Sequence, residues 1–321
     1  KVSTAEFFRQ FNSPTAILAE FSPPERILTA GERLGVEWWI SVFGVESLEG
    51  RRLLWRLEQA DRTFASEELA SVEAKAGDTK MIGRSEVIVP ALDKPAKLAL
   101  TAELAGTSVR NSWDVWVFPR RAAQPDAGKG IGASPRVYAA IKDRYPGLTE
   151  VSTVAADTPD LLLADRLDKN AVQALEKGRT VILLWLPGIA PGVELGWWAI
   201  REQAGTAIAR HPAFGDFPHD GCLNELLFRV LGHTVGLNDE ALHRVDPLMV
   251  GRGAADYLVH VFQAKAGKGK LLASGLELLS AKPEAVYLLD QFIRYARSPE
   301  FQPEGTFDPI RSGRSWESTD N

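Results

Sequence analysis

The sequence predicts two domains, a β-sandwich followed by an α/β domain built on a parallel sheet. Apolar and polar residues alternate with a period of two through the first third of the chain. A stretch rich in Ala, Gly, Pro and charged residues follows, and beyond it short apolar runs alternate with helical patterns. The chain has 321 residues, a length typical of about two domains. We place a lead-in at 1–12, the sandwich at 13–119, a linker at 120–134, the α/β domain at 135–300 and a polar tail at 301–321.

The predicted sandwich rests on four alternating segments. In the clearest of them, 34–42, every second residue from Leu34 to Val42 is apolar. The same pattern predicts strands over 53–57, 98–104 and 113–117, and turns that contain glycine separate them. Segment 66–76 fits either a short helix or a polar loop. Short alternating strands joined by turns are typical of a β-sandwich.

The second domain is predicted from a change of period. The continuous apolar run VILLWL at 181–186 is typical of a strand buried on both faces. Gly178 and Asn224 are a good C-cap and a good N-cap for two of the predicted helices. These helices span 135–144, 169–177, 224–231 and 283–296, and further strands span 151–155, 161–164, 206–209, 259–262 and 270–274. Strands that alternate with helices imply a parallel sheet with helices on both faces.

Composition excludes several classes of function. The chain is 45% hydrophobic and 25% charged, with a formal net charge of −5 and a pI near 5.7. These values are typical of a globular protein and lack the basic surface that nucleic acids require. No apolar run approaches the ~20 residues that cross a bilayer, and a single cysteine cannot form an internal disulfide. We therefore expect no nucleic-acid partner and no membrane span.

One segment gathers most of the residues that could bind or react. HPAFGDFPHDGCLNELLF, which starts at His211, holds two of the five histidines and the only cysteine. Aromatic residues that are exposed on a domain either stack on sugars or pack against another domain, and we favour packing. We expect Trp39 and Trp116 to be half-exposed in the same way. The candidate cleft or docking surface comprises His211, Phe214, Asp216, Phe217, His219, Asp220, Cys222 and Asn224, together with Trp197 and Trp198.

The sequence assigns no catalytic residue, metal or cofactor to this segment. Cys222 lacks the G-x-C-x-G turn of a nucleophile elbow, and Asp220 beside it would raise the pKa of the thiol. His211, His219 and Asp220 are residue types that bind zinc, but their spacing matches no compact metal motif. The interpretation we favour is that the histidines cap or hydrogen-bond locally within their loop.

Two further patterns contain residue types used in catalysis or phosphate binding. Glycoside hydrolysis needs two carboxyl groups that face each other across a sugar, and Asp216 and Asp220 lie near aromatic residues. Acidic loop residues are more often simply solvated. The glycines of AGKGIGAS, at 127–134, match neither a dinucleotide fingerprint nor a P-loop, so a flexible linker is the interpretation we favour there.

Several stretches resemble a known family. They are SPTAILAEF, NSWDVWVFP, VILLWLPG, ELGWWAI, GTAIARHPAFGDFPHDG, KGKLLASGLEL and PEAVYLLDQFIRYARSPEFQP. Together they resemble the C-terminal region of large bacterial proteins related to glycoside hydrolase family 2, the β-galactosidase-like and sugar-binding group. The resemblance implies an immunoglobulin-like sandwich followed by a flavodoxin-like domain similar to class I glutamine amidotransferases. It also implies a catalytic barrel N-terminal to these domains.

The resemblance carries no catalytic residue onto this chain. The two carboxylates of the family belong to the barrel, and the amidotransferase-like half lacks its reactive elbow. The sequence therefore predicts a non-catalytic accessory region of a glycoside hydrolase acting on polysaccharide or oligosaccharide. Its partners would be a glycan and an N-terminal catalytic domain of the same polypeptide. Any export signal for a periplasmic or extracellular protein would lie on that preceding part, since the sequence starts at Lys1 without a signal peptide.

Two alternatives stay open at this point. The first is an autonomous hydrolase or amidotransferase-like enzyme that uses Cys222 or a His/Asp site. The second is a carbohydrate-binding or protein-interaction module. In each case we expect the HPAFGDFPHDG segment to follow a strand and to lie at the carboxyl end of the parallel sheet, where open α/β sheets place their crevice.

Overall fold

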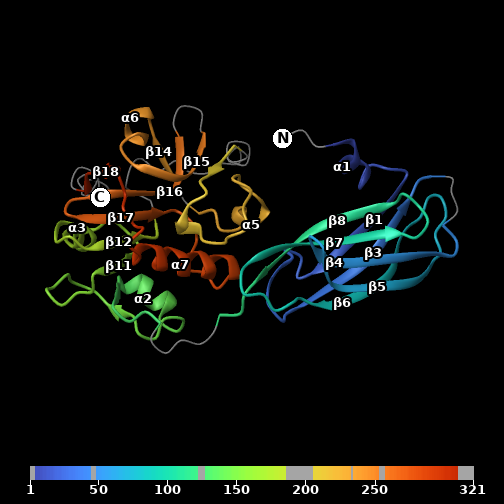
Figure 1. Cartoon of the computed structure of the whole chain (residues 1–321), viewed down its shortest axis with the longest axis horizontal. Helices are drawn as coiled ribbons and strands as arrows, with labels where there is room; N and C mark the ends of the chain where they lie inside the picture. The colour runs from blue at the N-terminus through green and yellow to red at the C-terminus, as the bar shows by residue number, and fades with distance from the viewer. Residues whose placement is uncertain are drawn as a thin grey trace, which may run out of the picture. The chain divides into compact units, whose positions relative to one another are not determined.

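The computed structural model describes residues 4–44, 48–121, 127–185, 205–232, 234–252 and 257–309. The chain divides into two compact units, Lys1–Arg121 and Ala122–Asn321. Both are rich in β-structure with few helices, and the second holds a mixed sheet with parallel strands. The prediction of a multidomain, β-rich protein is confirmed (Figure 1).

The first unit pairs a three-stranded sheet with a five-stranded one. Their strand orders are β1-β3-β6 and β2-β8-β7-β4-β5, antiparallel throughout except for the β2–β8 pair. The elements are α1 (Ala5–Arg9), β1 (Thr15–Ser22), β2 (Ile27–Thr29), β3 (Arg33–Val42), β4 (Arg51–Gln59), β5 (Arg62–Val72), β6 (Thr79–Ile88), β7 (Ala96–Leu104) and β8 (Arg110–Phe118). The four predicted strands are confirmed as β3, β4, β7 and β8.

Alternating side chains from both sheets form one core. Trp38 is fully buried and stacks on Trp55 with ring centroids 6.3 Å apart, while Trp113 packs against Trp38 at 5.8 Å. Aromatic pairs at these separations add to the stabilisation that burial itself provides. Trp39 is half-buried, as expected. Trp116 is 2% exposed, so the expectation of a half-exposed ring is wrong there; strand β2 pairs alongside it.

Segment 66–76 is neither a helix nor a loop over most of its length. Residues up to Val72 belong to β5, which pairs antiparallel with β4. Because β5 is the last strand of its sheet, Ser66, Glu67 and Glu68 are exposed and the apolar alternation that marks a buried strand is weak. The strand is held by its pairing with β4, which the local sequence does not reveal.

The second unit is built on one ten-stranded mixed sheet. The strand order along it is β10-β9-β11-β12-β17-β16-β15-β13, and β14 and β18 pair with β16 off this path. Neighbours from β10 to β17 run parallel, whereas β16, β15 and β13 each run antiparallel to the preceding strand.

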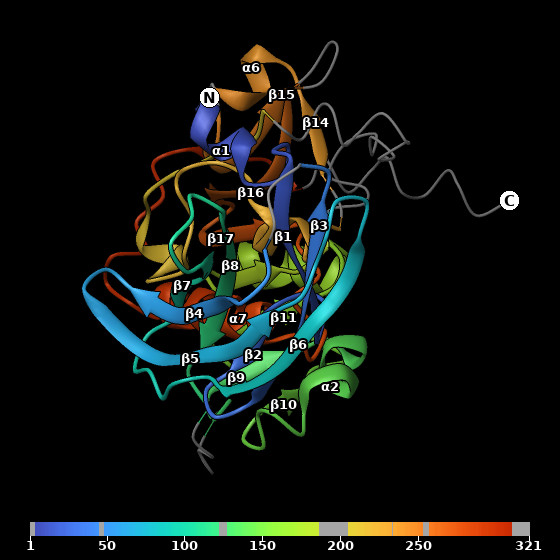
Figure 2. The same cartoon turned by 90° about the vertical axis from the view of Figure 1, so that its right-hand side faces the viewer.

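Most elements of the second unit are labelled in Figures 1 and 2. The elements are β9 (Ile131–Ala133), α2 (Pro135–Ile141), β10 (Thr149–Glu150), β11 (Leu161–Ala164), α3 (Lys169–Glu176), β12 (Thr180–Leu183), β13 (Ala207–Ile208), η1 (Pro212–Phe214), α5 (Glu225–Phe228), β14 (Val235–Leu237), α6 (Asp239–Leu242), β15 (Asp246–Arg252), β16 (Tyr257–Ala266), β17 (Gly269–Ser274), α7 (Pro283–Ala296) and β18 (Thr306–Phe307).

Helices cover both faces of this sheet. Phe262 and Ala264 of β16 share a hydrophobic cluster with α3. Gln263 lies between them, so its side chain points to the opposite face, and there it accepts a hydrogen bond from Tyr295 of α7. Helix α7 therefore lies on the face opposite α3. The predicted helices over 169–177 and 283–296 are confirmed, and Gly178 ends the first with a φ of 84°.

The predicted linker holds a strand of the sheet. Residues Ile131–Ala133 form β9, which is buried and pairs parallel with both β10 and β11. The glycines before it allow close packing, because a Cβ at Gly128 would lie 2.8 Å from the backbone N of Leu148. The strand predicted over 151–155 is wrong, because β10 ends at Glu150. Three other elements end earlier than predicted: α2 at Ile141, β12 at Leu183 and α5 at Phe228.

No helix within the described ranges is both long and apolar enough to cross a membrane.

The buried side chain of Asn111 links the two sheets of the first unit. Its Nδ2 donates to the carbonyl of Ile17 in β1 at 2.8 Å. We expect Asn111→Ala to lower the free energy of unfolding by about 1–2 kcal/mol, because a buried carbonyl loses its donor. Chemical denaturation followed by tryptophan fluorescence measures this. Ser112→Ala, at an exposed neighbouring position, should stay within about 0.5 kcal/mol of the wild type. Equal effects of the two changes would contradict the role given to Asn111.

Candidate functional site

The HPAFGDFPHDG segment starts at the amino ends of the parallel strands. It follows β13, which runs antiparallel to β15 and therefore against the direction of the parallel strands. His211 accordingly emerges beside Asp246, the first residue of β15. The expectation that the segment begins in the crevice at the carboxyl ends is wrong, because a two-residue strand gives no sequence signal for its direction.

From there the segment runs back along α7, opposite to the direction of the helix. His211 meets Tyr295 near the end of α7, with ring centroids 5.0 Å apart. Phe214 packs edge-on against Phe292 at 6.0 Å, and Phe217 lies 6.2 Å from Tyr287 nearer the start of the helix. Phe214 and Phe217 are 1% and 4% exposed. These phenylalanines are thus used in the interior of the second unit.

Gly215 lets the segment approach the helix. It adopts a φ of 55° with a ψ of −132°, a combination that side chains strongly disfavour. A Cβ on Gly215 would also lie 2.6 Å from Oε1 of Gln291. The next backbone N–H, that of Asp216, donates to the Tyr287 hydroxyl at 3.0 Å. Residues 211–217, which we name the α7 strap, therefore follow the helix at close range.

His211 begins a chain of hydrogen bonds inside the second unit. Its Nδ1 accepts from the backbone N–H of Ala213 at 3.2 Å, so the ring proton of the neutral form is on Nε2, which lies 3.5 Å from the Tyr295 hydroxyl. That hydroxyl donates to Gln263 at 2.8 Å, and the Gln263 amide reaches Asp246 at 3.4 Å. Burial lowers the pKa of His211, and the Asp246 and Glu300 carboxylates partly oppose it. Burial also raises the pKa of Tyr295, so the phenol stays protonated.

His219 is engaged in the same way. Its Nδ1 accepts from the backbone N–H of Gly221 at 3.2 Å, and its ring lies 5.6 Å from that of Phe214. Burial lowers the pKa of His219; Asp220 raises it and Arg210 lowers it further. Each histidine of the segment therefore caps a turn two residues ahead with Nδ1, as the interpretation of local hydrogen bonding predicts.

Cys222 lies at the edge of the sheet. It forms an isolated antiparallel bridge with Ala207 of β13 and its side chain is exposed. No hydrogen bond within the described part of the chain joins its sulfur to a histidine. Asn224 caps α5, as predicted: its Oδ1 accepts from the backbone N–H of Leu227 at 2.9 Å, and its Nδ2 donates to the carbonyl of Pro218 at 3.0 Å.

The remaining candidates are not brought into one site. Asp216 and Asp220 are both exposed on the loop surface. Trp197 and Trp198 lie outside the described residues. In the part of the chain that the structure describes, no group of three His, Cys, Asp or Glu side chains could hold a metal ion.

A buried ion pair anchors the far end of the segment to α7. Nε of Arg229, just after α5, lies 3.2 Å from Oε1 of Glu284 in the first turn of α7. The Glu284 side chain is fully buried, while that of Arg229 is 28% exposed. Lys282 also donates to the carbonyl of Arg229 at 2.7 Å. The segment is thus fastened to both ends of the helix.

Polar residues at the carboxyl ends of β9 and β11 were missed by the sequence reasoning. Ser134 directly follows β9 and Asp165 directly follows β11. The Ser134 hydroxyl donates a hydrogen bond to Asp165 Oδ1 at 2.6 Å. Asp165 is 6% exposed, and its second oxygen lies 3.3 Å from Nε of Arg166. The signal was present in the stretch LLLAD, a buried strand with a carboxylate at its end. Ser134 and Arg166 therefore each contact one oxygen of the Asp165 carboxylate.

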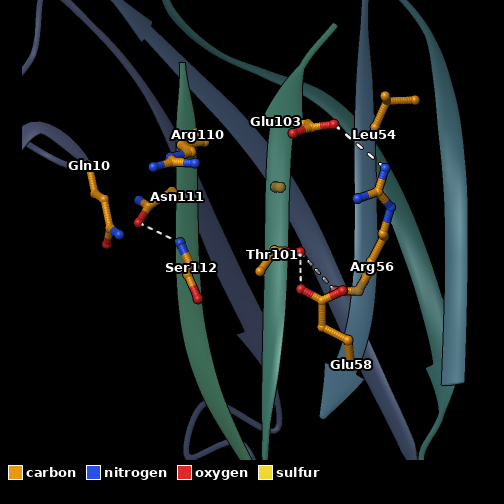
Figure 3. A pocket seen from close by; sticks show the side chains of 10 residues that line it. Gln10, Leu54, Arg56, Glu58, Thr101, Glu103, Arg110, Asn111 and Ser112 are labelled. Atoms are coloured by element: carbon orange, nitrogen blue, oxygen red, sulfur yellow. Dashed lines mark hydrogen bonds and ion pairs between the residues drawn. The ribbon is translucent and has the colours of Figure 1, made fainter. Parts of the chain in front are cut away.

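A groove on the outer face of the sandwich was also missed. It has a volume of about 330 Å³ and lies over β4, β7 and β8 (Figure 3). Its lining residues are Gln10, Leu54, Arg56, Glu58, Thr101, Ala102, Glu103, Arg110, Asn111 and Ser112. No sequence motif marks it, because its residues come together only through the register of three strands.

Comparison with protein families gives two matches, one in each unit. Residues 32–119 match the family described as "Domain of unknown function (DUF8488)", and residues 162–312 match "Domain of unknown function (DUF8487)". No curated protein matches the chain.

Solved structures resemble parts of the chain at low similarity. Among them are a β-glucosidase from Listeria innocua in complex with glucose (14% identity, TM-score 0.25, 34% of this chain and 16% of that one) and a β-glucuronidase from Parabacteroides merdae (11%, 0.23, 53% and 23%). An alkylpurine DNA glycosylase from Pseudomonas fluorescens matches at 13% identity with a TM-score of 0.25, over 33% of this chain and 30% of that one. The matched part spans less than a third of each of these three proteins. Glycosidases are thus among the structures that resemble parts of this chain.

The two histidines make stability depend on pH. Their folded-state pKa values lie below the ordinary 6.5, so the unfolded chain binds more protons near that pH. Their contribution is therefore fully present above pH 6.5 and is lost as the pH falls through 6.5 towards the folded values. We expect the free energy of unfolding to fall between about pH 7 and about pH 5 more steeply in the wild type than in the His211→Asn, His219→Asn double variant. Parallel curves for the two proteins would contradict this.

The ion pair at the start of α7 should matter more than a surface pair of the same type. We expect Arg229→Ala to destabilise the second unit by about 3 kcal/mol, because it leaves the buried Glu284 carboxylate without this partner. Arg244→Ala removes an exposed pair with Glu240 and should cost less than about 0.5 kcal/mol. Thermal unfolding of both variants measures the difference, and similar losses would refute the anchoring role.

Proposed function

We propose that this chain is a non-catalytic accessory region of a glycoside hydrolase that acts on an oligosaccharide or a polysaccharide. In this proposal an immunoglobulin-like sandwich is followed by a flavodoxin-like domain. The sequence resemblance, above all NSWDVWVFP and HPAFGDFPHDG, supports the family setting. The catalytic carboxylates would lie in an N-terminal domain of the same polypeptide, and that domain would be a packing partner of this chain.

The topology of the second unit supports the flavodoxin-like assignment. Numbered by their order in the sequence, the parallel strands β9, β10, β11, β12 and β17 are arranged 2-1-3-4-5. This is the order of doubly wound sheets of the flavodoxin type. In such sheets the direction of winding reverses between the first and third strands, where Ser134 and Asp165 meet.

The observation that carries the accessory role is that the two histidines of the HPAFGDFPHDG segment form hydrogen bonds within their own loop. Nδ1 of His211 and Nδ1 of His219 each accept a backbone N–H of their own loop. A general base must present a free nitrogen to a substrate or nucleophile. The other ring nitrogen of His211, Nε2, lies 3.5 Å from the Tyr295 hydroxyl within the second unit. An imidazole used to cap a turn and contact a helix acts as a structural residue.

A second enzyme hypothesis, with Cys222 as nucleophile, receives no support from the geometry. A reactive cysteine needs a group that lowers the pKa of its thiol and an oxyanion site in front of it. Cys222 is instead an exposed residue beside a two-residue edge strand.

The purified chain should show no turnover of aryl-glycosides or of glutamine above a buffer blank. Product release from p-nitrophenyl glycosides and ammonia release from glutamine measure the two activities. Any trace activity should be unchanged in Cys222→Ala, since contaminants and not this chain would cause it. Turnover of an aryl-glycoside or of glutamine that disappears in Cys222→Ala or in His219→Asn would overturn the accessory assignment.

A further inference from the structure

We propose that the groove on the outer face of the sandwich binds an uncharged oligosaccharide. Figure 3 shows its side chains rising from three adjacent strands, with Gln10 closing one end. The inference goes beyond the accessory role because it assigns a ligand and a surface. It rests on the residues of the groove and on no property of the α/β unit.

Strand register places the polar groups in two rows across the sheet. Arg56 of β4 is opposite Thr101 of β7, and Thr101 is opposite Ser112 of β8. Leu54, Glu103 and Arg110 form the neighbouring row in the same way. Residues two apart on a strand point to the same face, so both rows face the solvent side of this sheet. The result is a patterned surface of donors and acceptors.

The charges of the groove select against ions. Arg56 and Arg110 balance Glu58 and Glu103, so the formal charge of the lining is zero. An anion would meet two carboxylates and a cation would meet two guanidinium groups. A neutral ligand with many hydroxyl groups suits both kinds of side chain, because each hydroxyl donates one hydrogen bond and accepts others. Sugars are the biological ligands with that chemistry.

The internal bonds of the groove are long enough to be exchanged for a ligand. Arg56 and Glu103 are 3.7 Å apart, with side chains 50% and 47% exposed. The Thr101 hydroxyl lies 3.4 Å from Glu58 Oε1 and 3.5 Å from the carbonyl of Arg56. Exposed ion pairs of this kind contribute little to stability. These groups can therefore turn to hydroxyls without a large loss of folding energy.

The size and polarity of the groove set the expected affinity. Its volume of about 330 Å³ is at the lower end of the range for small-molecule sites. Leu54 is its apolar side chain on the solvent face, since Ala102 belongs to the core cluster between the sheets, and its lining residues include no aromatic ring. Binding would therefore depend on hydrogen bonds that replace those with water, and we expect a Kd of about 1 mM or somewhat tighter.

Isothermal titration of the whole chain with hexasaccharides of β-1,4-linked glucose, xylose and mannose tests this. We expect saturable binding of at least one of them and none of inorganic phosphate or magnesium chloride. Failure of all three sugars to bind, or saturable binding of phosphate instead, would overturn the proposal. Such a failure, in a chain that remains inactive on aryl-glycosides, would leave the accessory role standing, so the two proposals can fail separately.

Matched variants locate the binding. Arg56→Ala should weaken it by about tenfold. Arg33→Ala removes the same kind of exposed cross-strand pair, with Glu86, on the other sheet and should leave binding unchanged. Ser112→Tyr fills the groove from an exposed position and should abolish binding while the unfolding midpoint is preserved. Wild-type affinity in both Arg56→Ala and Ser112→Tyr would show that the groove is not the site.

Discussion

The close approach of the α7 strap to helix α7 determines where the side chains of the HPAFGDFPHDG segment lie. Gly215 has a backbone conformation that favours glycine, and a side chain there would collide with Gln291. Because the backbone lies so near the helix, Phe214 and Phe217, which precede and follow Gly215 in the sequence, are buried against α7. His211 caps a turn of the strap with its Nδ1, and His219 caps the turn that follows the strap. The phenylalanines and histidines of this segment thereby contribute to the packing and turns of the second unit.

The same constraint explains the polar chain that begins at His211. A strap that enters at the amino ends of the sheet brings an imidazole to Tyr295, and the phenol must then find an acceptor on the sheet. Gln263 serves because it points away from the α3 side, and Asp246 completes the series while accepting two backbone N–H groups from Glu304 and Gly305. Buried polar groups connected in this way are stable only when every member has a partner.

The sequence predicted elements whose apolar residues repeat with a regular period. It did not predict strands that form only because they pair with a neighbouring strand. The helix at 283–296 could be predicted because its apolar face recurs with helical period and Pro283 marks its start. The strand at β5 could not, because an edge strand exposes polar residues and is held by its neighbour. Strand β9 was hidden among glycines that serve close packing. In the candidate site, Asn224 was recognised as a cap from its residue type, whereas the direction of β13, and with it the place of the strap, depends on long-range contacts.

Within the described residues, the path of the ten-stranded sheet ends on both sides in a strand of two residues, β10 and β13. A long open margin would offer a row of unpaired backbone amides and carbonyls to any extended polypeptide. Here the margin at β13 is already occupied by the returning chain at Cys222, and the margin at β10 is too short to template a partner. Both margins of the sheet therefore expose little backbone with which an extended segment of a second copy could pair.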